Sequence, residues 1–208
     1  MNDSPDIAGL FRDIDLLLKP DNPLGWCPDS KAHALAAIVL SLRPATTVEI
    51  GVFGGRSFLP MAMAHKALDH GLAIGIDPWD PSASVEGQVD PANVRWWSGL
   101  NHDMVYAHFV QHLRRLGLEK VTQILRFRSD EICVPEDIGL LHIDGNHGEQ
   151  AYLDALRFAP NVRPGGFCVL DDLHWTGGAV GRAAGWLGEN GFEYLYPLGS
   201  GAVYRRMA

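Results

Sequence analysis

Three acidic side chains follow two short apolar runs in the second half of this 208-residue chain. Asp144 follows the run 139–143, and the adjacent pair Asp171 and Asp172 follows the run 167–170. If the two runs are neighbouring strands, the carboxylates meet at one edge of a sheet, where bare anions would raise one another's pKa. A divalent cation would relieve this repulsion, and oxygen ligands favour Mg²⁺, with Mn²⁺ or Ca²⁺ as alternatives. The competing interpretation is that Asp171 or Asp172 only caps the following helix.

A histidine close to the first of these acids is suited to proton transfer. His147 follows Asp144 by three residues, and an ordinary imidazole pKa of about 6.5 leaves it mostly unprotonated near neutrality. It could therefore act as a general base. The nearby carboxylate would raise its pKa, whereas a bound metal would lower it. The alternative is a histidine that meets solvent at the start of a helix, and His174 is likewise either a substrate contact or a surface residue.

A glycine-rich turn lies in the first half of the chain, in the segment Val-Glu-Ile-Gly-Val-Phe-Gly-Gly-Arg-Ser over residues 48–57. Gly51 allows a tight turn, while Gly54 and Gly55 would let a ligand approach backbone amides at the start of the next helix. The spacing G-x-x-G-G differs from the dinucleotide-binding pattern G-x-G-x-x-G. Glu49 lies inside the preceding apolar run, where a carboxylate needs backbone amides or a cationic ligand beside it.

Apolar runs and helical patterns alternate along most of the chain, and the strands and helices that they predict must position the candidate side chains. Helices are predicted over 7–18, 30–42, 56–68, 104–116, 149–158 and 179–189, and strands over 46–50, 72–76, 121–127, 139–143, 167–170, 192–196 and 202–206. Residues 78–100 are predicted as a long binding-site loop. Short strands separated by helices indicate a parallel sheet with right-handed crossovers. The last two strands should form an antiparallel hairpin, which completes a three-layer α/β sandwich with ligands at the carboxyl ends of the strands.

Asp77 follows the second predicted strand and should lie beside the glycine turn. An acid there can accept hydrogen bonds from both hydroxyls of a ribose. A capping aspartate after an ordinary glycine-rich connection is the alternative. Trp79, Trp96 and Trp97 lie in or near the loop that follows. They could form an aromatic wall over a sugar or aryl group, or they could pack into the core and hold the loop in place.

The glycine turn and Asp77 resemble motif I and the following acidic position of class I S-adenosylmethionine-dependent methyltransferases, over roughly residues 30–206. The resemblance implies a seven-stranded, mostly parallel Rossmann-like sheet with a C-terminal antiparallel hairpin. It also implies that an E-x-G-x-x-x-G turn cradles the methionine part of the cofactor, that the acid binds ribose, and that the segment after the third strand contacts adenine. The positions that it assigns to the cofactor are Glu49, Gly51, Gly54, Gly55, Ser57, Asp77, Ser129 and Asp144.

The second half of the chain is similar to a narrower group. The pattern H-I-D-G-N-H, then P-G-G, then D-D is similar to metal-dependent small-molecule O-methyltransferases related to macrocin O-methyltransferase, within methyltransferase family 24. This similarity implies that Asp144, Asp171 and Asp172 hold Mg²⁺. Some members carry a second aspartate, two residues after the first, as the base. Here that position is Asn146, so the role of the base passes to His147.

The implied reaction is Mg²⁺-dependent transfer of a methyl group from S-adenosylmethionine to a hydroxyl of a small-molecule acceptor. A metal lowers the pKa of a coordinated hydroxyl and orients it, while His147 removes the proton. Two adjacent oxygens on the acceptor could chelate the metal. We therefore expect a sugar diol, a catechol-like diol or another natural product of secondary metabolism as the acceptor.

Composition argues against several other classes of protein. Lys and Arg number 17 against 25 Asp and Glu, and the net charge of −8 disfavours a nucleic-acid partner. Three cysteines without a CxxC pair indicate neither a zinc site nor a disulfide framework. No apolar run approaches the roughly 18 residues of a membrane span, and the acidic N-terminal region is unlike a signal peptide. We expect a cytoplasmic protein of one domain without membrane contact, and homo-oligomerisation stays open.

Within that domain, residues 1–29 are expected to form an N-terminal helix and lid-like segment, and residues 30–208 the catalytic core. Three other functions stay open at this point. An NAD-dependent oxidoreductase would share the sheet, but the glycine spacing differs and no Tyr-x-x-x-Lys pair is present. A metal-dependent hydrolase would leave Glu49 and Asp77 without a purpose. A non-catalytic cofactor-binding protein is compatible with the sequence.

Overall fold

A single mixed sheet forms the centre of the protein. The computed structural model describes residues 5–22 and 24–208. Its seven strands have the order β3-β2-β1-β4-β5-β7-β6, in which β7 runs antiparallel to both of its neighbours. The predicted α/β fold with a C-terminal hairpin is therefore confirmed. The strands are β1 (Thr46–Ile50), β2 (Leu72–Ile76), β3 (Thr122–Leu125), β4 (Ile138–Ile143), β5 (Val162–Leu170), β6 (Phe192–Leu198) and β7 (Gly201–Arg206).

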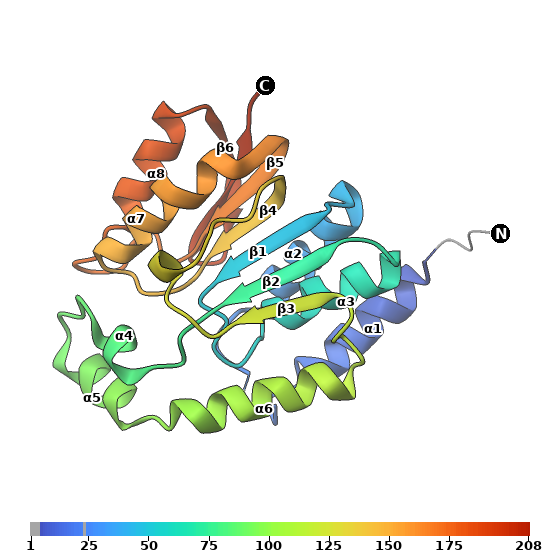
Figure 1. Cartoon of the computed structure of the whole chain (residues 1–208), viewed down its shortest axis with the longest axis horizontal. Helices are drawn as coiled ribbons and strands as arrows, with labels where there is room; N and C mark the ends of the chain where they lie inside the picture. Colours follow the sequence, from blue (N-terminus) through green and yellow to red (C-terminus); the bar gives the residue numbers. More distant parts are fainter. Residues whose placement is uncertain (1–4, 23) are drawn as a thin grey trace.

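Helices cover both faces of this sheet, as Figure 1 shows. The apolar sides of α1, α2, α3 and α6 pack together on one face, and those of α7 and α8 on the other. Each side encloses its own buried apolar cluster, so the protein has three layers. The helices are α1 (Ile7–Leu17), α2 (Asp29–Leu42), α3 (Phe58–Leu68), α4 (Pro81–Val85), α5 (Pro91–Gly99), α6 (His102–Arg115), α7 (Glu149–Phe158) and α8 (Val180–Glu189), with short 3-10 turns at Ser129–Glu131 and Ala159–Asn161.

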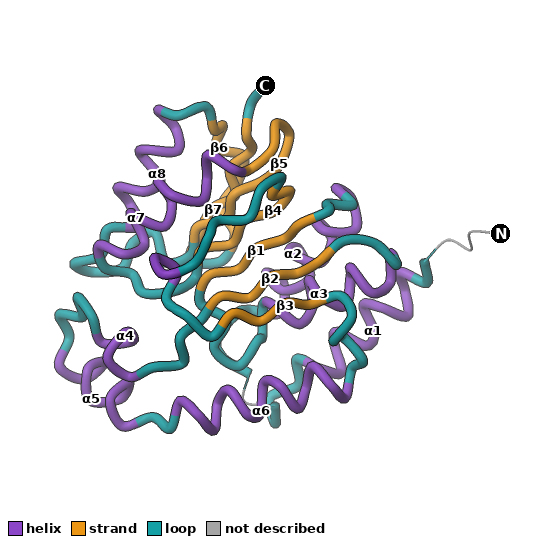
Figure 2. Tube along the Cα trace, in the orientation of Figure 1, coloured by secondary structure: helices purple, strands orange, loops and turns teal. Residues whose placement is uncertain are grey.

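The segment predicted as a long loop after β2 instead contains two short helices. The side chain of Asp80 accepts hydrogen bonds from the backbone amides of Ser82 and Ala83, and Asp90 accepts one from Ala92. Each of these aspartates precedes a proline in the first helical turn, a combination that favours helix initiation. Figure 2 shows α4 and α5 beyond the carboxyl ends of β1, β2 and β3, where they flank the region expected to bind ligands.

The strand register brings the candidate residues to one edge of the sheet. Ile50 is level with Ile76 on one side and with Ile143 on the other, and Ile143 is level with Leu170. Because the last residues of these strands are aligned, the candidate residue that follows each of them lies at the same edge of the sheet. These residues are Gly51, Asp77, Asp144 and Asp171. The expectation that β4 and β5 are neighbours is confirmed.

Among the described residues, no helix combines the length and the apolar character that crossing a bilayer would require.

Candidate active site

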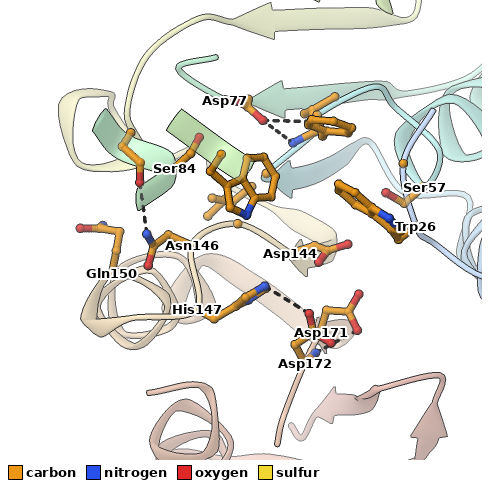
Figure 3. A pocket seen from close by; sticks show the side chains of 18 of the residues that line it. Trp26, Ser57, Asp77, Ser84, Asp144, Asn146, His147, Gln150, Asp171 and Asp172 are labelled. Atoms are coloured by element: carbon orange, nitrogen blue, oxygen red, sulfur yellow. Dashed lines mark hydrogen bonds and ion pairs between the residues drawn. The ribbon is translucent and has the colours of Figure 1, made fainter. Parts of the chain in front are cut away.

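A cavity of about 790 Å³ opens at the carboxyl ends of the parallel strands. Its volume lies in the range of small-molecule sites. Figure 3 shows that its lining comes from segments far apart in the sequence, with Asp77 across the cavity from His147 and Asp172. Eight of the predicted site residues line it: Gly51, Ser57, Asp77, Ser129, Asp144, His147, Asp171 and Asp172. Three others, Glu49, Gly54 and Gly55, are not among the lining residues.

The glycine turn is shaped by contacts within the chain. Gly51 has a φ of 86°, and a Cβ there would lie 2.4 Å from the carbonyl oxygen of Asp144. A Cβ on Gly54 would lie 2.7 Å from the carbonyl oxygen of Leu24, and one on Gly55 would meet the ring of Phe109. We expected the last two glycines to admit a ligand, and this stays a prediction. A Cβ at either position would meet protein atoms, so these glycines also allow the chain to pack closely against itself.

Glu49 is fully buried and contacts a residue of the cavity wall without lining the cavity itself. Its Oε1 accepts a hydrogen bond of 2.5 Å from the hydroxyl of Ser57, and it lies 2.6 Å from Nδ1 of His142. Glu49 and His142 are level in the pairing of β1 with β4. Burial raises the pKa of Glu49 and lowers that of His142, and both shifts favour a pair without net charge. Glu49 therefore holds Ser57, which does line the cavity.

Asp77 ties the turn after β1 to the end of β2. Its Oδ2 accepts hydrogen bonds from the amides of Val52 and Phe53, at 3.0 and 2.9 Å, and its Oδ1 accepts one from Trp79 at 2.7 Å. Burial raises the pKa of Asp77, and these three amides oppose the rise. A carboxylate offers about four acceptor positions, so one remains for a ligand hydroxyl. We expected Asp77 to accept both ribose hydroxyls.

Lys31, which the sequence reasoning missed, lies at the centre of the acidic group. It belongs to the first turn of α2, is fully buried, donates a hydrogen bond from Nζ to Oδ2 of Asp171, and lies 3.7 Å from Oδ2 of Asp144. Burial alone would lower the pKa of Lys31, but Asp144 and Asp171 outweigh it and raise that pKa. Burial alone would raise the pKa of Asp171, but Lys31 holds it well below its usual range. The two side chains therefore form a buried ion pair.

His147 and Asp172 form a second pair on the cavity wall, shown in Figure 3. Nε2 of His147 lies 3.1 Å from Oδ2 of Asp172, and the imidazole packs against Trp175 with ring centroids 4.5 Å apart. Asp172 has a φ of 50°, a left-handed conformation that a non-glycine residue adopts at some cost and that is frequent at functional sites. Burial lowers the pKa of His147 despite the neighbouring carboxylates, so the imidazole is neutral near neutral pH.

The carboxylates expected to hold Mg²⁺ do not fit such an ion in this arrangement. Oδ1 of Asp171 accepts hydrogen bonds from Ser200 and from the amide of Asp172, and its Oδ2 is paired with Lys31. Asp172 faces His147. We expected a metal because three bare anions would repel one another. Lys31 places a positive charge between Asp144 and Asp171, and hydrogen bonds occupy both oxygens of Asp171, which weakens that reason.

Another group of side chains comes closer to the spacing of metal ligands. In the part of the chain that the structure describes, only Glu49, His142 and Asp144 offer ligand atoms that all lie within 4.8 Å of one another. Glu49 and His142 are fully buried and do not line the cavity, whereas Asp144 does. The ammonium of Lys31, 3.7 Å from Asp144, would repel a cation at this group.

A polar cluster from α7 lies beside Ser129. The hydroxyl of Ser129 donates to Oδ1 of Asp154 at 2.6 Å, and the amide of Gln150 donates to the same oxygen at 2.8 Å. Burial raises the pKa of Asp154 to about 6. All three residues line the cavity and could recognise the polar edge of a heterocycle. The sequence analysis named only Ser129, although the i, i+4 spacing of the other two was a usable signal.

Aromatic side chains form another part of the cavity wall. Trp26 stacks on Phe53 with centroids 5.2 Å apart and meets Trp96 and Trp97 edge-on. Trp79 is different, because it is 3% exposed and its Nε1 donates to the carbonyl oxygen of Phe53. Of the two interpretations of the loop tryptophans, core packing applies to Trp79. The other two belong to the aromatic wall.

Comparisons with known proteins agree with this architecture. The O-methyltransferase NovP has 15% identity and a TM-score of 0.68, with 86% of this chain and 81% of NovP covered. TomG, an O-methyltransferase from Streptomyces achromogenes involved in tomaymycin synthesis and solved with SAM, has 16% identity and a TM-score of 0.61, with 97% and 87% covered. An O-methyltransferase from Bacillus cereus, solved with SAH, has 12% identity and a TM-score of 0.61, with 96% and 91% covered.

The sheet order and the glycine turn beside two strand-end acids define a class I S-adenosylmethionine-dependent methyltransferase. A family model described as a methyltransferase domain, Methyltransf_24, matches residues 48–173, which is more than half of the chain. The chain belongs to this family. No curated protein matches it.

Proposed function

We propose that this protein transfers the methyl group of S-adenosylmethionine to a hydroxyl oxygen of a small-molecule acceptor, with His147 as the general base. The observation that carries the proposal is the pairing of the partly buried imidazole of His147 with Asp172, on the wall of a cavity that also contains Gly51 of the glycine turn. Family membership supports methyl transfer, and the O-methyltransferases among the structural neighbours show the same fold.

The residues around the turn suit the methionine and ribose parts of the donor. The hydroxyl of Ser57 and the carboxylate of Asp144 line the cavity beside Gly51, where they can bind an α-amino group. The remaining acceptor position of Asp77 suits one ribose hydroxyl. Because the sulfonium of the donor is positively charged, the acidic side of the cavity favours its binding. Ser129, with Gln150 and Asp154 behind it, suits the amino edge of adenine.

Proton transfer follows from the geometry of the histidine pair. Nε2 of His147 lies 3.1 Å from Oδ2 of Asp172, and a neutral imidazole with its proton on Nε2 leaves Nδ1 free to accept the proton of the acceptor hydroxyl. Bound S-adenosylmethionine would supply an activated methyl group, which the acceptor oxygen takes while the electron pair of the broken carbon–sulfur bond stays on the sulfur of S-adenosylhomocysteine. Asp172 stabilises the imidazolium that remains.

The aromatic wall indicates which acceptors fit. Trp26, Phe53, Trp96 and Trp97 present ring faces and edges at one side of the cavity, and such surfaces suit a planar aryl group or the apolar face of a sugar. We therefore propose a catechol-like compound, a glycoside or another natural product with a free hydroxyl as the acceptor.

The proposal is tested by calorimetric titration with S-adenosylmethionine and with NAD, followed by a mass-spectrometric screen of catechols, glycosides and vicinal diols. Binding of the first ligand and addition of one methyl group to an acceptor oxygen are expected. Binding of NAD alone would indicate an oxidoreductase. Tight binding of the methyl donor without transfer to any compound of the screen would favour a non-catalytic role.

Replacing Asp77 with asparagine is expected to loosen the turn after β1. An amide has one acceptor oxygen and places an NH₂ group against a backbone donor, so at least one of the three amide hydrogen bonds is lost. We expect a loss of about 1–3 kcal/mol in the free energy of unfolding, measured in urea, together with weaker binding of S-adenosylmethionine. Asp13→Asn on the exposed side of α1 is the matched control. Unchanged stability and affinity in Asp77→Asn would contradict the anchoring role.

A further inference from the structure

We infer that the ammonium group of Lys31 takes the cation position between Asp144 and Asp171, so that this methyltransferase maintains its acidic centre without a divalent ion. Lys31 reaches this position from the first turn of α2, a segment 140 residues before Asp171 in the sequence. The inference concerns the charge balance of the site and is tested through metal binding, which does not depend on any acceptor.

The position of the ammonium is fixed from several sides. Nζ of Lys31 donates to Oδ2 of Asp171 and lies 3.7 Å from Oδ2 of Asp144. The side chain is fully buried, and a Cβ on Gly199 would lie 3.8 Å from Cδ of Lys31. The hydroxyl of Ser200, in the turn between β6 and β7, donates to Oδ1 of Asp171 at 2.7 Å. Both oxygens of Asp171 therefore have partners, and the side chain of Lys31 has no exposed surface.

The ammonium of Lys31 disfavours an additional cation at Asp144 and Asp171, because it lies 3.7 Å from Oδ2 of the first and donates a hydrogen bond to Oδ2 of the second. The neutral imidazole of His147 gives Asp172 a polar neighbour and adds no charge. A divalent ion bound to Asp144 and Asp171 would lie within a few ångströms of a buried ammonium, where like charges repel strongly because water does not screen them. It would also have to displace Lys31 from a hydrogen bond inside the protein. In contrast, the donor's sulfonium can approach from the cavity side, where Asp144 is partly exposed.

The inference predicts opposite metal binding by the natural protein and a lysine variant. Titration of the natural protein with Mg²⁺ by calorimetry, and with Mn²⁺ by electron paramagnetic resonance, should detect no site at this centre. Lys31→Ala removes the ammonium and leaves space between two carboxylates, so Mn²⁺ should bind at least about tenfold more tightly than to the natural protein. Mg²⁺ should also raise the thermal stability of this variant and not that of the natural protein.

Two further variants locate the effect. Lys120→Ala removes an exposed lysine and should bind metal no better than the natural protein does. The double variant Lys31→Ala/Asp171→Ala should lose the gained site. Binding of Mg²⁺ to the natural protein that disappears in Asp171→Ala would overturn the inference, as would a folded Lys31→Ala protein that gains no affinity for Mn²⁺.

If Lys31→Ala does not fold, the titration of the natural protein decides the question by itself. Methyl transfer provides a separate check, since transfer by the natural protein should be equal in excess chelator and in Mg²⁺. Loss of transfer in chelator alone would contradict the inference. Absence of transfer in both buffers would instead count against the proposed function and leave the metal titrations to decide the role of Lys31.

Discussion

Replacement of His147 by alanine is expected to lower kcat for methyl transfer about 10²-fold or more, because the acceptor hydroxyl then loses its general base. The affinity for S-adenosylmethionine should stay unchanged, since the imidazole faces Asp172 and Trp175 rather than the glycine turn. Steady-state kinetics with an acceptor from the screen, together with calorimetric titration of the donor, would measure both quantities.

His174→Ala is the matched control for this substitution. His174 is exposed and is not among the residues that line the cavity, so its removal should alter neither kcat nor donor affinity. A His147→Ala protein with full kcat would exclude the imidazole as the base. A protein that loses donor affinity in proportion to its activity would show that His147 holds the cofactor instead of moving a proton.

The same histidine predicts the pH profile. A general base works only when it is unprotonated, so kcat/KM should fall as the pH drops through the pKa of His147. Burial, with help from Lys31, places that pKa below its ordinary value of 6.5, although Asp172 and Asp171 oppose the shift. Activity should therefore persist at slightly acidic pH. In Asp172→Asn the opposing charge is gone, so the acid limb should move to still lower pH while kcat falls.

The strand ends were accessible from sequence because they depend on local rules. Apolar runs between helical segments indicate a parallel sheet, and the residue after each run must lie at its carboxyl edge. The same rules place Asp77 beside the glycine turn, and Asp144 with Asp171 at the ends of two neighbouring strands. The prediction of a loop was wrong for α4 and α5, although Asp80-Pro81 and Asp90-Pro91 are typical of helix starts. The Pro-, Ser-, Gly- and Trp-rich composition of that segment is typical of a loop, and composition alone cannot separate short helices from a loop.

The partners of the site residues were less accessible, because they depend on packing between distant segments. Lys31 resembles a surface lysine at the start of an amphipathic helix, and nothing local shows that α2 points its first turn at the end of β5. The pairing of Glu49 with His142 required the register of β1 against β4. We expected a metal ion because three carboxylates lie close together. The buried ammonium of Lys31 between two of them weakens that argument, and its position could not be predicted from the sequence.

Replacement of Asp144 by alanine is expected to have the broadest effect of any single change in the site. The carboxylate lines the cavity beside Gly51 and Ser57 and also faces Lys31, so it serves the donor and the buried ion pair together. Loss of a hydrogen bond to a charged group costs about 1.5–3 kcal/mol, which corresponds to roughly a 10- to 100-fold weaker affinity for S-adenosylmethionine. Methyl transfer should fall to background, because the remaining donor is bound without fixed orientation.

The contrast between the two alanine variants separates the roles that we assign. Asp144→Ala should lose donor affinity and turnover together, whereas His147→Ala should lose turnover alone. Asp144→Asn adds a test of charge, because it preserves the shape of the side chain and should recover part of the donor affinity. Asp13→Ala, on the exposed face of α1, is the control for loss of an acidic group. Equal losses of donor affinity in Asp144→Ala and His147→Ala would mean that both side chains hold the cofactor, and the base would then have to be sought elsewhere in the cavity.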